Sequence, residues 1–236
     1  MMLYQDIINE LLILENPIKA KILAGFFKTG PGQYGEGDKF LGIMVPTTRK
    51  IVKKYIQNIT LFDIQELLCS PWHEIRLAGV LFLVQKFQKG NQIEQEDIFH
   101  FYLKHTKYIN NWDLVDVSAP YIIGAYLFDK KRDILKSFAQ SDDLWERRIS
   151  IIATFFFIRK GDYITTFSII EILLGDAHDL IHKANGWMLR EIGKLCGEDI
   201  LEGFLSTYYQ QTPRTTLRYA IERFDTKRRK YWLQGP

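Results

Sequence analysis

An indole and two carboxylates lie close together in the segment Asn-Trp-Asp-Leu-Val-Asp that ends at Asp116. Trp112 and Asp116 are four residues apart, so on a helix they share one face. A fixed carboxylate beside an electron-rich ring stabilises a positive charge that develops next to them. Asp113 lies about 100° away from Trp112 around the helix, and we expect it to serve the helix start.

The same residues also permit a structural interpretation. Trp112 could be a core residue, and Asp116 could pair with Arg148 or Arg76, because ion pairs also fill the interfaces between helical repeats. The residues alone leave both interpretations open.

Asp116 occupies a position that is basic in four other segments of the chain. Aligned on that position, the segments carry Arg76, Asp116, Arg148, Lys183 and Arg218, which are separated by 40, 32, 35 and 35 residues. Such a period is typical of a two-helix unit that buries its apolar face by stacking on its neighbours. One acid in a row of cations is a poor arrangement for stability alone. It is useful where a cationic group must sit beside the acid while its neighbours hold a polyanion.

Helices must position these residues, because apolar side chains recur at helical spacing along almost the whole chain. One such stripe consists of Leu77, Val80, Leu81 and Val84. Ser70 and Thr212 each precede a proline, which predicts a helix start with a capping residue ahead of a first-turn proline. No linker rich in proline, serine or charge divides the chain. The pattern therefore predicts an all-α fold, an α-α superhelix in which residues 1–236 form a single domain.

Stacked repeats would place several cations in one line, so we expect a concave basic groove on the superhelix. Cations in a shared register can follow the phosphates of a polyanion. A solvated charged face is the usual explanation for scattered charges, and it is the alternative here. The candidate phosphate contacts are Arg76, Arg147, Arg159, Lys160, Lys183, Arg190, Arg214 and Arg218.

The composition of the whole chain excludes little. Its 236 residues are 47% hydrophobic and carry a formal net charge of +3, which by itself does not argue for nucleic acid. Cys69 and Cys196 form no CxxC motif, and acidic residues stand near the N-terminus where a signal peptide would carry basic ones. We therefore expect a reduced, cytoplasmic setting. The apolar run 149–158 is too short to span a membrane, which takes ~18 residues or more.

A second aromatic candidate is Trp187, which follows Gly186 in a helical pattern. A glycine inside a helix costs ~1 kcal/mol relative to alanine, so it indicates that another helix or a ligand approaches closely. Close helix packing, with Trp187 as a filler, is the simpler interpretation.

Two further motifs are weaker. Residues 30–35 match G-x-G-x-x-G, but no strand precedes them, and Glu36 and Asp38 follow where a helix start should meet phosphate. We reject a dinucleotide site there and expect a mobile or substrate-capping loop. His178 and His182 have the spacing of a zinc motif without an apparent third ligand, so we expect only a helix start. The residues call for no cofactor and no metal.

Several segments, spaced along most of the chain, resemble the AlkD-like DNA alkylation-repair glycosylases, a family built from HEAT-like helical repeats. The matching segments are 27–30, 35–42, 111–116, 145–148 and 186–191. The chain departs from some relatives at two positions. Asn111 stands where they carry another aromatic residue, and Phe26 stands where they carry tyrosine.

The resemblance implies a monofunctional glycosylase that removes N3- or N7-alkylated purines from duplex DNA, as a monomer in the cytoplasm, associated with the nucleoid when on DNA. By matching motifs, Asp116 corresponds to the catalytic carboxylate and Arg148 to the basic partner at the site. Trp112 and Trp187 correspond to aromatic walls around the damaged nucleotide. The alternative is a non-catalytic HEAT-like solenoid that binds DNA or a protein partner through the same groove.

We predict that the protein binds duplex DNA with an affinity that falls steeply with salt. If about five of the candidate cations meet phosphates, log K plotted against log[salt] has a slope of about −4 to −5, because each neutralised phosphate releases a counterion. Titration of a labelled duplex at several salt concentrations measures this slope. An affinity that ignores salt, or no binding at low salt, would favour a protein partner.

Overall fold

The computed structural model describes residues 2–235, which fold mostly as helices. Within that range the only strand-like pairing is an isolated parallel bridge between Lys39 and Trp72. The expected all-α class is confirmed. The chain forms two compact units, Met1–Ser118 (unit 1) and Ala119–Pro236 (unit 2). The interpretation of residues 1–236 as a single domain stays a prediction.

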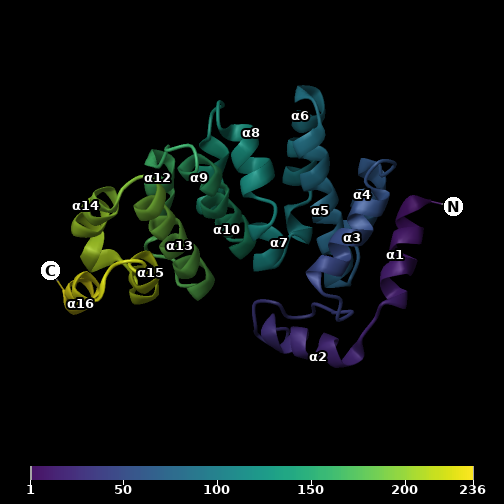
Figure 1. Ribbon diagram of the computed structural model, residues 1–236, viewed down its shortest axis with the longest axis horizontal. Helices are drawn as coiled ribbons and strands as arrows, with labels where there is room; N and C mark the ends of the chain where they lie inside the picture. Colours follow the sequence, from purple (N-terminus) through teal and green to yellow (C-terminus); the bar gives the residue numbers. More distant parts are fainter. Residues whose placement is uncertain (1, 236) are drawn as a thin grey trace. The chain divides into compact units, whose positions relative to one another are not determined.

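Unit 1 is built around helix α5. Its helices are α1 (Leu3–Ile13), α2 (Pro17–Phe26), α3 (Val45–Tyr55), α4 (Leu61–Leu68), α5 (His73–Lys89), α6 (Gln92–Lys104), the 3-10 turn η1 (Thr106–Tyr108) and α7 (Trp112–Asp116). Helices α3, α4 and α6 pack against α5 (Figure 1). The predicted apolar stripe of α5 is buried, but so are Phe82 and Leu83, because neighbouring helices cover α5 on almost every side.

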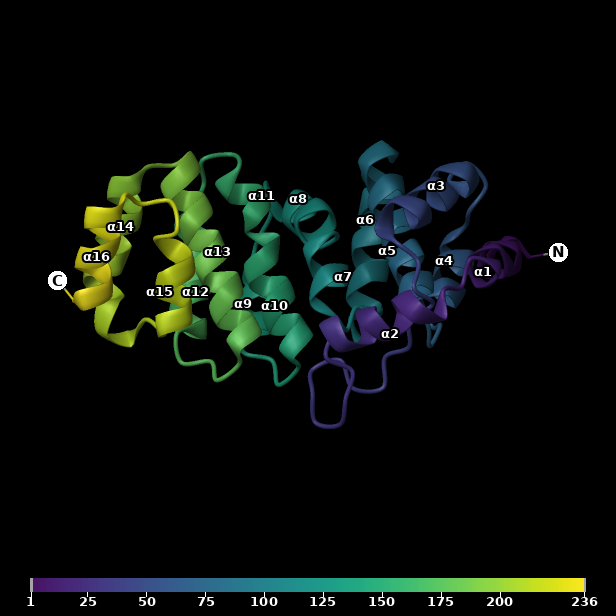
Figure 2. The same cartoon turned by 60° about the horizontal axis from the view of Figure 1, so that its bottom comes forward.

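Helix α2 is the exception in unit 1, because none of its residues is buried. Ile18, Ile22 and Phe26 are four residues apart and exposed. At the start of α2, the backbone N–H of Asn16 donates to the carbonyl oxygen of Leu41 at 2.7 Å. Figure 2 shows α2 in front of the other helices of unit 1. It is followed by residues 29–39, called the Gly-rich loop below. The helix is therefore attached mainly through its ends and the linking segment.

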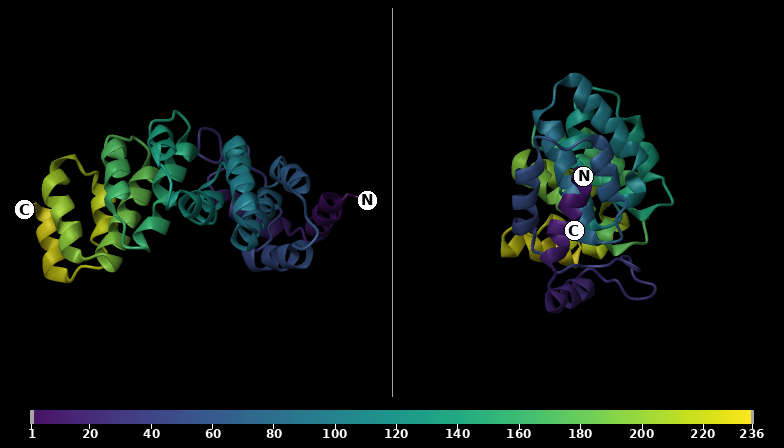
Figure 3. Two further views of the ribbon diagram at one scale, coloured as in Figure 1. Left: turned by 90° about the horizontal axis from the view of Figure 1, so that it is seen from above. Right: turned by 90° about the vertical axis from the view of Figure 1, so that its right-hand side faces the viewer.

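Unit 2 continues with paired helices. Its elements are η2 (Pro120–Gly124), α8 (Ala125–Leu127), α9 (Asp133–Ala139), α10 (Leu144–Ala153), α11 (Phe155–Ile158), α12 (Ile164–Leu173), α13 (Asp179–Leu195), α14 (Glu198–Tyr208), η3 (Tyr209–Gln211), α15 (Arg214–Ala220) and α16 (Thr226–Gln234). Helix α9 packs against α10, and α13 packs against α14 and α15 (Figure 3). Between residues 2 and 235, no helix has both the length and the apolar character that crossing a membrane requires.

The predicted repeat register is confirmed within individual helices. Asp116, Arg148, Lys183 and Arg218 are each the fifth residue of their helices α7, α10, α13 and α15. Arg76 is the fourth residue of α5. Residues aligned by sequence period therefore occupy nearly the same place near each helix start.

The predicted helix starts at proline are wrong by one or two residues. Helix α5 begins at His73 with Trp72 as its N-cap, so Pro71 precedes the helix. The backbone N–H of His73 donates to the carbonyl oxygen of Lys39 at 2.7 Å, and this pairing keeps Trp72 extended. Helix α15 likewise begins one residue after its proline. At α5, the backbone bond to Lys39 therefore outweighs the preference of Ser70 and Pro71 for a helix start.

Gly186 is required where α13 meets α15. A Cβ atom at this position would lie 2.4 Å from the Cβ atom of Tyr219 and 2.6 Å from the carbonyl oxygen of Thr216. Both distances are below van der Waals contact, and one involves backbone that cannot move alone. The simpler interpretation of Gly186, close helix packing, is confirmed.

We predict that Gly186→Ala lowers the free energy of unfolding by up to about 2 kcal/mol. Overpacking usually costs about 1–3 kcal/mol, and the ~1 kcal/mol by which alanine favours a helix offsets only part of this cost. Gly203→Ala in α14 is the matched control, because nothing lies within 4 Å of its added Cβ atom; we expect it to gain up to ~1 kcal/mol. Denaturant unfolding of both variants measures the difference. Equal changes would contradict the contact with α15.

Candidate functional site

Helix α7, which carries the predicted carboxylate and indole, is only five residues long and is held at both ends. The side chain of the buried Asn111 accepts a hydrogen bond from the backbone N–H of Trp112 at 2.9 Å. Just beyond the helix, the Ser118 hydroxyl donates to the carbonyl oxygen of Leu114 at 2.6 Å. The same hydroxyl lies 2.9 Å from that of the buried Tyr102 in α6. Because so short a helix is unstable alone, these contacts determine where its side chains lie.

Trp112 and Asp116 are both half-buried, so each combines a fixed position with access from solvent. The Trp112 ring stacks on Phe27, with centroids 5.2 Å apart, and meets Phe26 edge-on at 5.8 Å. Burial raises the pKa of Tyr102, and the carboxylate of Asp116 adds to this effect. The negative charge of Asp116 thus acts on Tyr102, a buried residue of α6.

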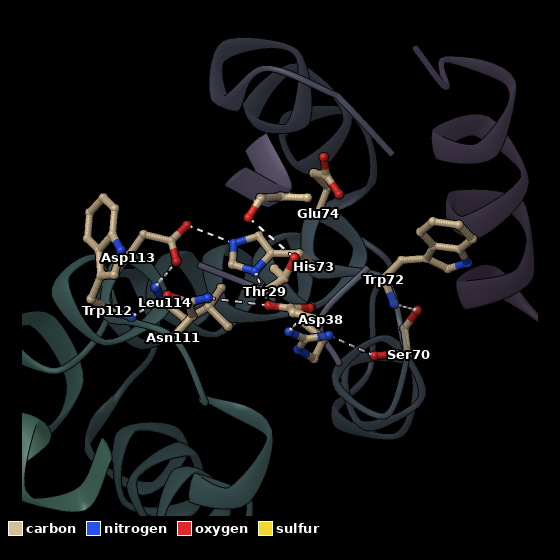
Figure 4. Close-up of polar contacts among 12 residues, drawn as sticks. Thr29, Asp38, Ser70, Trp72, His73, Glu74, Asn111, Trp112, Asp113 and Leu114 are labelled. Carbon is tan, nitrogen blue, oxygen red and sulfur yellow. Dashed lines mark hydrogen bonds and ion pairs between the residues drawn. The ribbon is translucent and has the colours of Figure 1, made fainter. Parts of the chain in front are cut away.

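His73 of α5 lies buried between two carboxylates (Figure 4). Its Nδ1 atom is 2.9 Å from Oδ2 of Asp38, and its Nε2 atom is 2.9 Å from Oδ2 of Asp113. Asp38 also accepts a hydrogen bond from Arg76 at 2.7 Å and one from the side chain of Asn111 at 3.4 Å. This network, called the His73 network below, joins the Gly-rich loop, α5 and the start of α7.

Aromatic rings enclose the His73 network. Phe40 stacks on the imidazole with centroids 4.5 Å apart, and Phe27 lies tilted over it at 4.9 Å. Phe27 is also the ring on which Trp112 stacks. One aromatic side chain therefore contacts both the buried histidine and the candidate indole.

The His73 network favours the charged forms of His73 and Asp38. Burial opposes the imidazolium, but the bonds to Asp113 and Asp38 outweigh it and raise the pKa of His73 to about 9. Burial likewise opposes the carboxylate of Asp38, yet the bond from His73 and the charge of Arg76 lower the pKa of Asp38.

Asp113 serves the helix start only in part. Its Oδ1 atom accepts a hydrogen bond from the backbone N–H of Leu114 at 2.9 Å, which agrees with the expected role at the helix start. Its Oδ2 atom, however, is bonded to His73. This second role of Asp113 was not predicted, and neither was a role for His73 or the bond between His73 and Asp38. These partners are 35 and 40 residues away from His73, so no local spacing links them.

Arg76 requires a correction. Its side chain is buried and donates to Asp38 and to the carbonyl oxygen of Ser70. It therefore neither pairs with Asp116 nor presents its charge to a phosphate. Desolvation makes an unpaired buried charge costly, which explains why this cation is bound to a carboxylate.

The Gly-rich loop between α2 and α3 is bonded to its neighbours in unit 1. The sequence predicted either a mobile loop or one that caps the substrate. Asp38 at its end belongs to the His73 network. The backbone N–H of Gly35 donates to the carbonyl oxygen of Lys28 at 3.1 Å, and a Cβ atom on Gly35 would lie 2.5 Å from the carbonyl oxygen of Phe27. A substrate-capping role for this loop stays a prediction.

Arg148 and Trp187 belong to unit 2. Arg148 in α10 is buried, and its guanidinium donates to the carbonyl oxygen of Leu180 at 2.6 Å. Trp187 in α13 is half-buried and contacts Phe155, with centroids 5.7 Å apart. That these two residues act together with Asp116 stays a prediction.

The other candidate phosphate contacts also lie in unit 2 and differ in their partners. Three have acidic partners: Arg147 binds Asp176, Lys183 binds Asp179, and Arg190 binds Glu222. Ion pairs at the surface contribute only about 0–1 kcal/mol, so a phosphate can compete for such cations. Four others are exposed, namely Arg159, Lys160, Arg214 and Arg218.

The two histidines with zinc-like spacing begin helix α13. His178 is its N-cap and accepts from the backbone N–H of Leu180 at 3.1 Å. His182 places Nε2 2.5 Å from the carbonyl oxygen of Asp176. The helix-start interpretation is confirmed. Within residues 2–235, no three metal-binding side chains are grouped closely enough to hold an ion.

Comparison with known proteins now identifies the family. The family model described as DNA alkylation repair enzyme matches residues 7–224. The chain belongs to this family. A solved structure titled a predicted DNA alkylation repair enzyme from Enterococcus faecalis has the same fold, with a TM-score of 0.72 over 90% of this chain and 97% of that one. At 17% identity it supports the fold alone. None of the curated proteins matches significantly.

We predict that stability falls at alkaline pH because of the His73 network. The pKa of His73 in the folded protein, about 9, exceeds the ordinary value of 6.5 expected when the chain is unfolded. The resulting stabilisation, at most about 3 kcal/mol, is complete below about pH 6.5 and is lost as the pH rises through about 9. Denaturant unfolding across this range measures the loss.

His73→Gln provides the comparison for this prediction, because it removes the titrating group and should flatten the curve between about pH 6.5 and 9. His100→Gln is the control, since His100 is exposed and its ion pair with Glu96, at 3.9 Å, is exposed as well. A wild-type curve no steeper than that of His73→Gln would refute the assignment.

Proposed function

We propose that the protein is a monofunctional DNA glycosylase that hydrolyses the N-glycosidic bond of N3- or N7-alkylated purines in duplex DNA, with Asp116 as the catalytic carboxylate. Membership of the DNA alkylation repair family supports an action on alkylated DNA. The observation that carries the assignment is the placement of Asp116 on the same short helix as Trp112, where both side chains are half-buried. Asp113, the other carboxylate of α7, is bonded to His73 and to the backbone N–H of Leu114.

The chemistry requires little beyond a carboxylate and aromatic faces. An N3- or N7-alkylated purine is positively charged and therefore leaves readily. The sugar becomes cationic as the bond breaks, and a fixed carboxylate with an indole beside it stabilises that charge more than the ground state. Asp116 also suits the task of holding the attacking water. No metal, nucleotide cofactor or lysine Schiff base is needed for this reaction.

The proposal assigns Arg148 and Trp187 of unit 2 to the same reaction, on the strength of their matching motifs. Arg148 would be the basic partner at the site, and Trp187 would cover a second side of the damaged nucleotide. The other DNA contacts would be Arg147, Arg159, Lys160, Lys183, Arg190, Arg214 and Arg218. We propose that the protein acts on DNA as a monomer in the cytoplasm, associated with the nucleoid when on DNA.

A non-catalytic solenoid that binds DNA or a protein partner is the alternative. Incubation with duplex DNA carrying N7-methylguanine, followed by alkaline cleavage at abasic sites, separates the two. A glycosylase leaves alkali-labile sites, whereas a binding protein leaves the strand intact.

We predict that Asp116→Asn lowers the single-turnover excision rate by roughly 10²-fold or more, about 2.7 kcal/mol of barrier. The substitution preserves size and hydrogen-bonding reach but removes the charge that would face the sugar cation. DNA affinity should hold or rise, because a negative charge has left a surface that meets phosphates. Single-turnover kinetics measure the rate, a binding titration measures the affinity, and a melting curve on the same preparation shows whether the variant is folded.

Two control variants sharpen this test. Asp129→Asn removes the same charge from an exposed position and should change neither rate nor stability. Asp113→Asn should lower the melting temperature, because it breaks the bond to buried His73. If Asp116 is only a structural partner, its variant will instead lose stability, with excision and binding declining together. A well-folded Asp116→Asn that excises at the wild-type rate would end the proposal.

A further inference from the structure

The contacts of His73 require a doubly protonated ring. A neutral imidazole has one N–H and can donate to only one of two facing carboxylates. Both ring nitrogens of His73 lie 2.9 Å from carboxylate oxygens. Asp38 is held as a carboxylate, since Arg76 donates to it, and two of its neighbours in the network, Arg76 and His73, face it with N–H groups.

This cation joins three segments that are distant in sequence. It bonds the Gly-rich loop through Asp38 and the first turn of α7 through Asp113, the neighbour of Trp112. A second route to Trp112 runs through Phe27, which contacts both rings. The position of the indole therefore depends on His73 through the backbone of α7 and through an aromatic contact.

We propose that His73 is a positioning residue whose imidazolium holds α7, and with it Trp112 and Asp116, in the geometry that base excision requires. This inference rests on the proposed function. His73 is buried, so its effect passes through Asp113 and Phe27. The charged groups that face it are Asp38 from the loop and Asp113 from α7, with Arg76 bound behind Asp38.

Loss of one proton to solvent would change these contacts. One ring nitrogen would then present a lone pair to a carboxylate oxygen at hydrogen-bond distance, and that acceptor pair repels. Glu74, the next residue in α5, cannot take over as a partner, because its carboxylate already accepts from the backbone N–H groups of Leu41, Gly42 and Ile43. The start of α7 is the part of the network left to move.

NMR of the full-length protein tests the linkage without any excision assay. Long-range 1H–15N spectra should show His73, among the five histidines, with both ring nitrogens protonated at about pH 7.5. Its titration should have a midpoint near pH 9, well above the ordinary range. The indole N–H resonance of Trp112, assigned with Trp112→Phe, should shift with the same midpoint. A Trp112 resonance that does not follow the titration of His73 would overturn the proposal.

Kinetics test the consequence for catalysis. His73→Gln retains donors for one carboxylate but places its amide oxygen against the other. We expect the single-turnover excision rate at saturating protein to fall at least tenfold at about pH 7.5, with DNA affinity within twofold of wild type. The double variant His73→Gln/Asp113→Asn should recover most of the rate, because the new amide can donate to the glutamine oxygen. His100→Gln, a substitution of a surface histidine, should behave as wild type.

The outcomes separate this inference from the proposed function. If His73→Gln excises at the wild-type rate while Asp116→Asn is inactive, the glycosylase assignment stands and the positioning role is refuted. If the double variant stays as slow as His73→Gln despite a wild-type melting temperature, the role through Asp113 is refuted. If the wild-type protein does not excise alkylated bases, the proposed function fails, and the shared titration of His73 and Trp112 alone decides whether His73 positions the indole.

Discussion

A buried positive charge between two carboxylates determines much of unit 1. Desolvating an ion is costly, and the cost is offset only when its partners are placed well. His73 achieves this by drawing its partners from the Gly-rich loop and from α7, while Arg76 and Asn111 complete the bonding of Asp38. The bond between His73 and Asp38 anchors the loop, and the backbone pairing of His73 with Lys39 beside it keeps Trp72 extended and delays the start of α5. A helix of five residues can hold its position because this network and the Tyr102–Ser118 pair act at its two ends.

Unit 2 relies on a different kind of contact. Its helices approach closely where a side chain is missing, as at Gly186 beside Tyr219. Its arginines bond to main-chain carbonyl groups as well as to acids: Arg148 to Leu180, and Arg147 to Ser141 and Asp142. Such bonds use the acceptor capacity of carbonyl groups in a loop, at Ser141 and Asp142, and in a helix, at Leu180. Arg148 is buried, whereas Arg147 is half-buried and keeps its charge near the surface.

The parts of the structure that depend on local spacing were predictable from the sequence. Helical periodicity predicted the all-α class, and the alignment of Arg76, Asp116, Arg148, Lys183 and Arg218 predicted their nearly equal places in five helices. Burial and pairing between distant segments were not predictable in this way. Arg76 had the expected register but not the expected exposure, because its partner Asp38 is 38 residues away in a loop. His73 drew no attention at all, since a lone histidine in a helix has no distinguishing spacing.

Helix α2 differs from the other α-helices of unit 1 in burying no side chain. Local opening of a helix costs little when few apolar contacts are lost, so the amide hydrogens of α2 should exchange with solvent far faster than those of α5. The last residues of α2 lead directly into Phe27, the ring that supports Trp112. Opening of α2 would therefore loosen the support of the indole while the interior of unit 1 stays folded. The aromatic wall of the proposed site thus adjoins the α-helix of unit 1 that buries no side chain, whereas the carboxylate lies at the far end of α7, next to the contact between Tyr102 and Ser118.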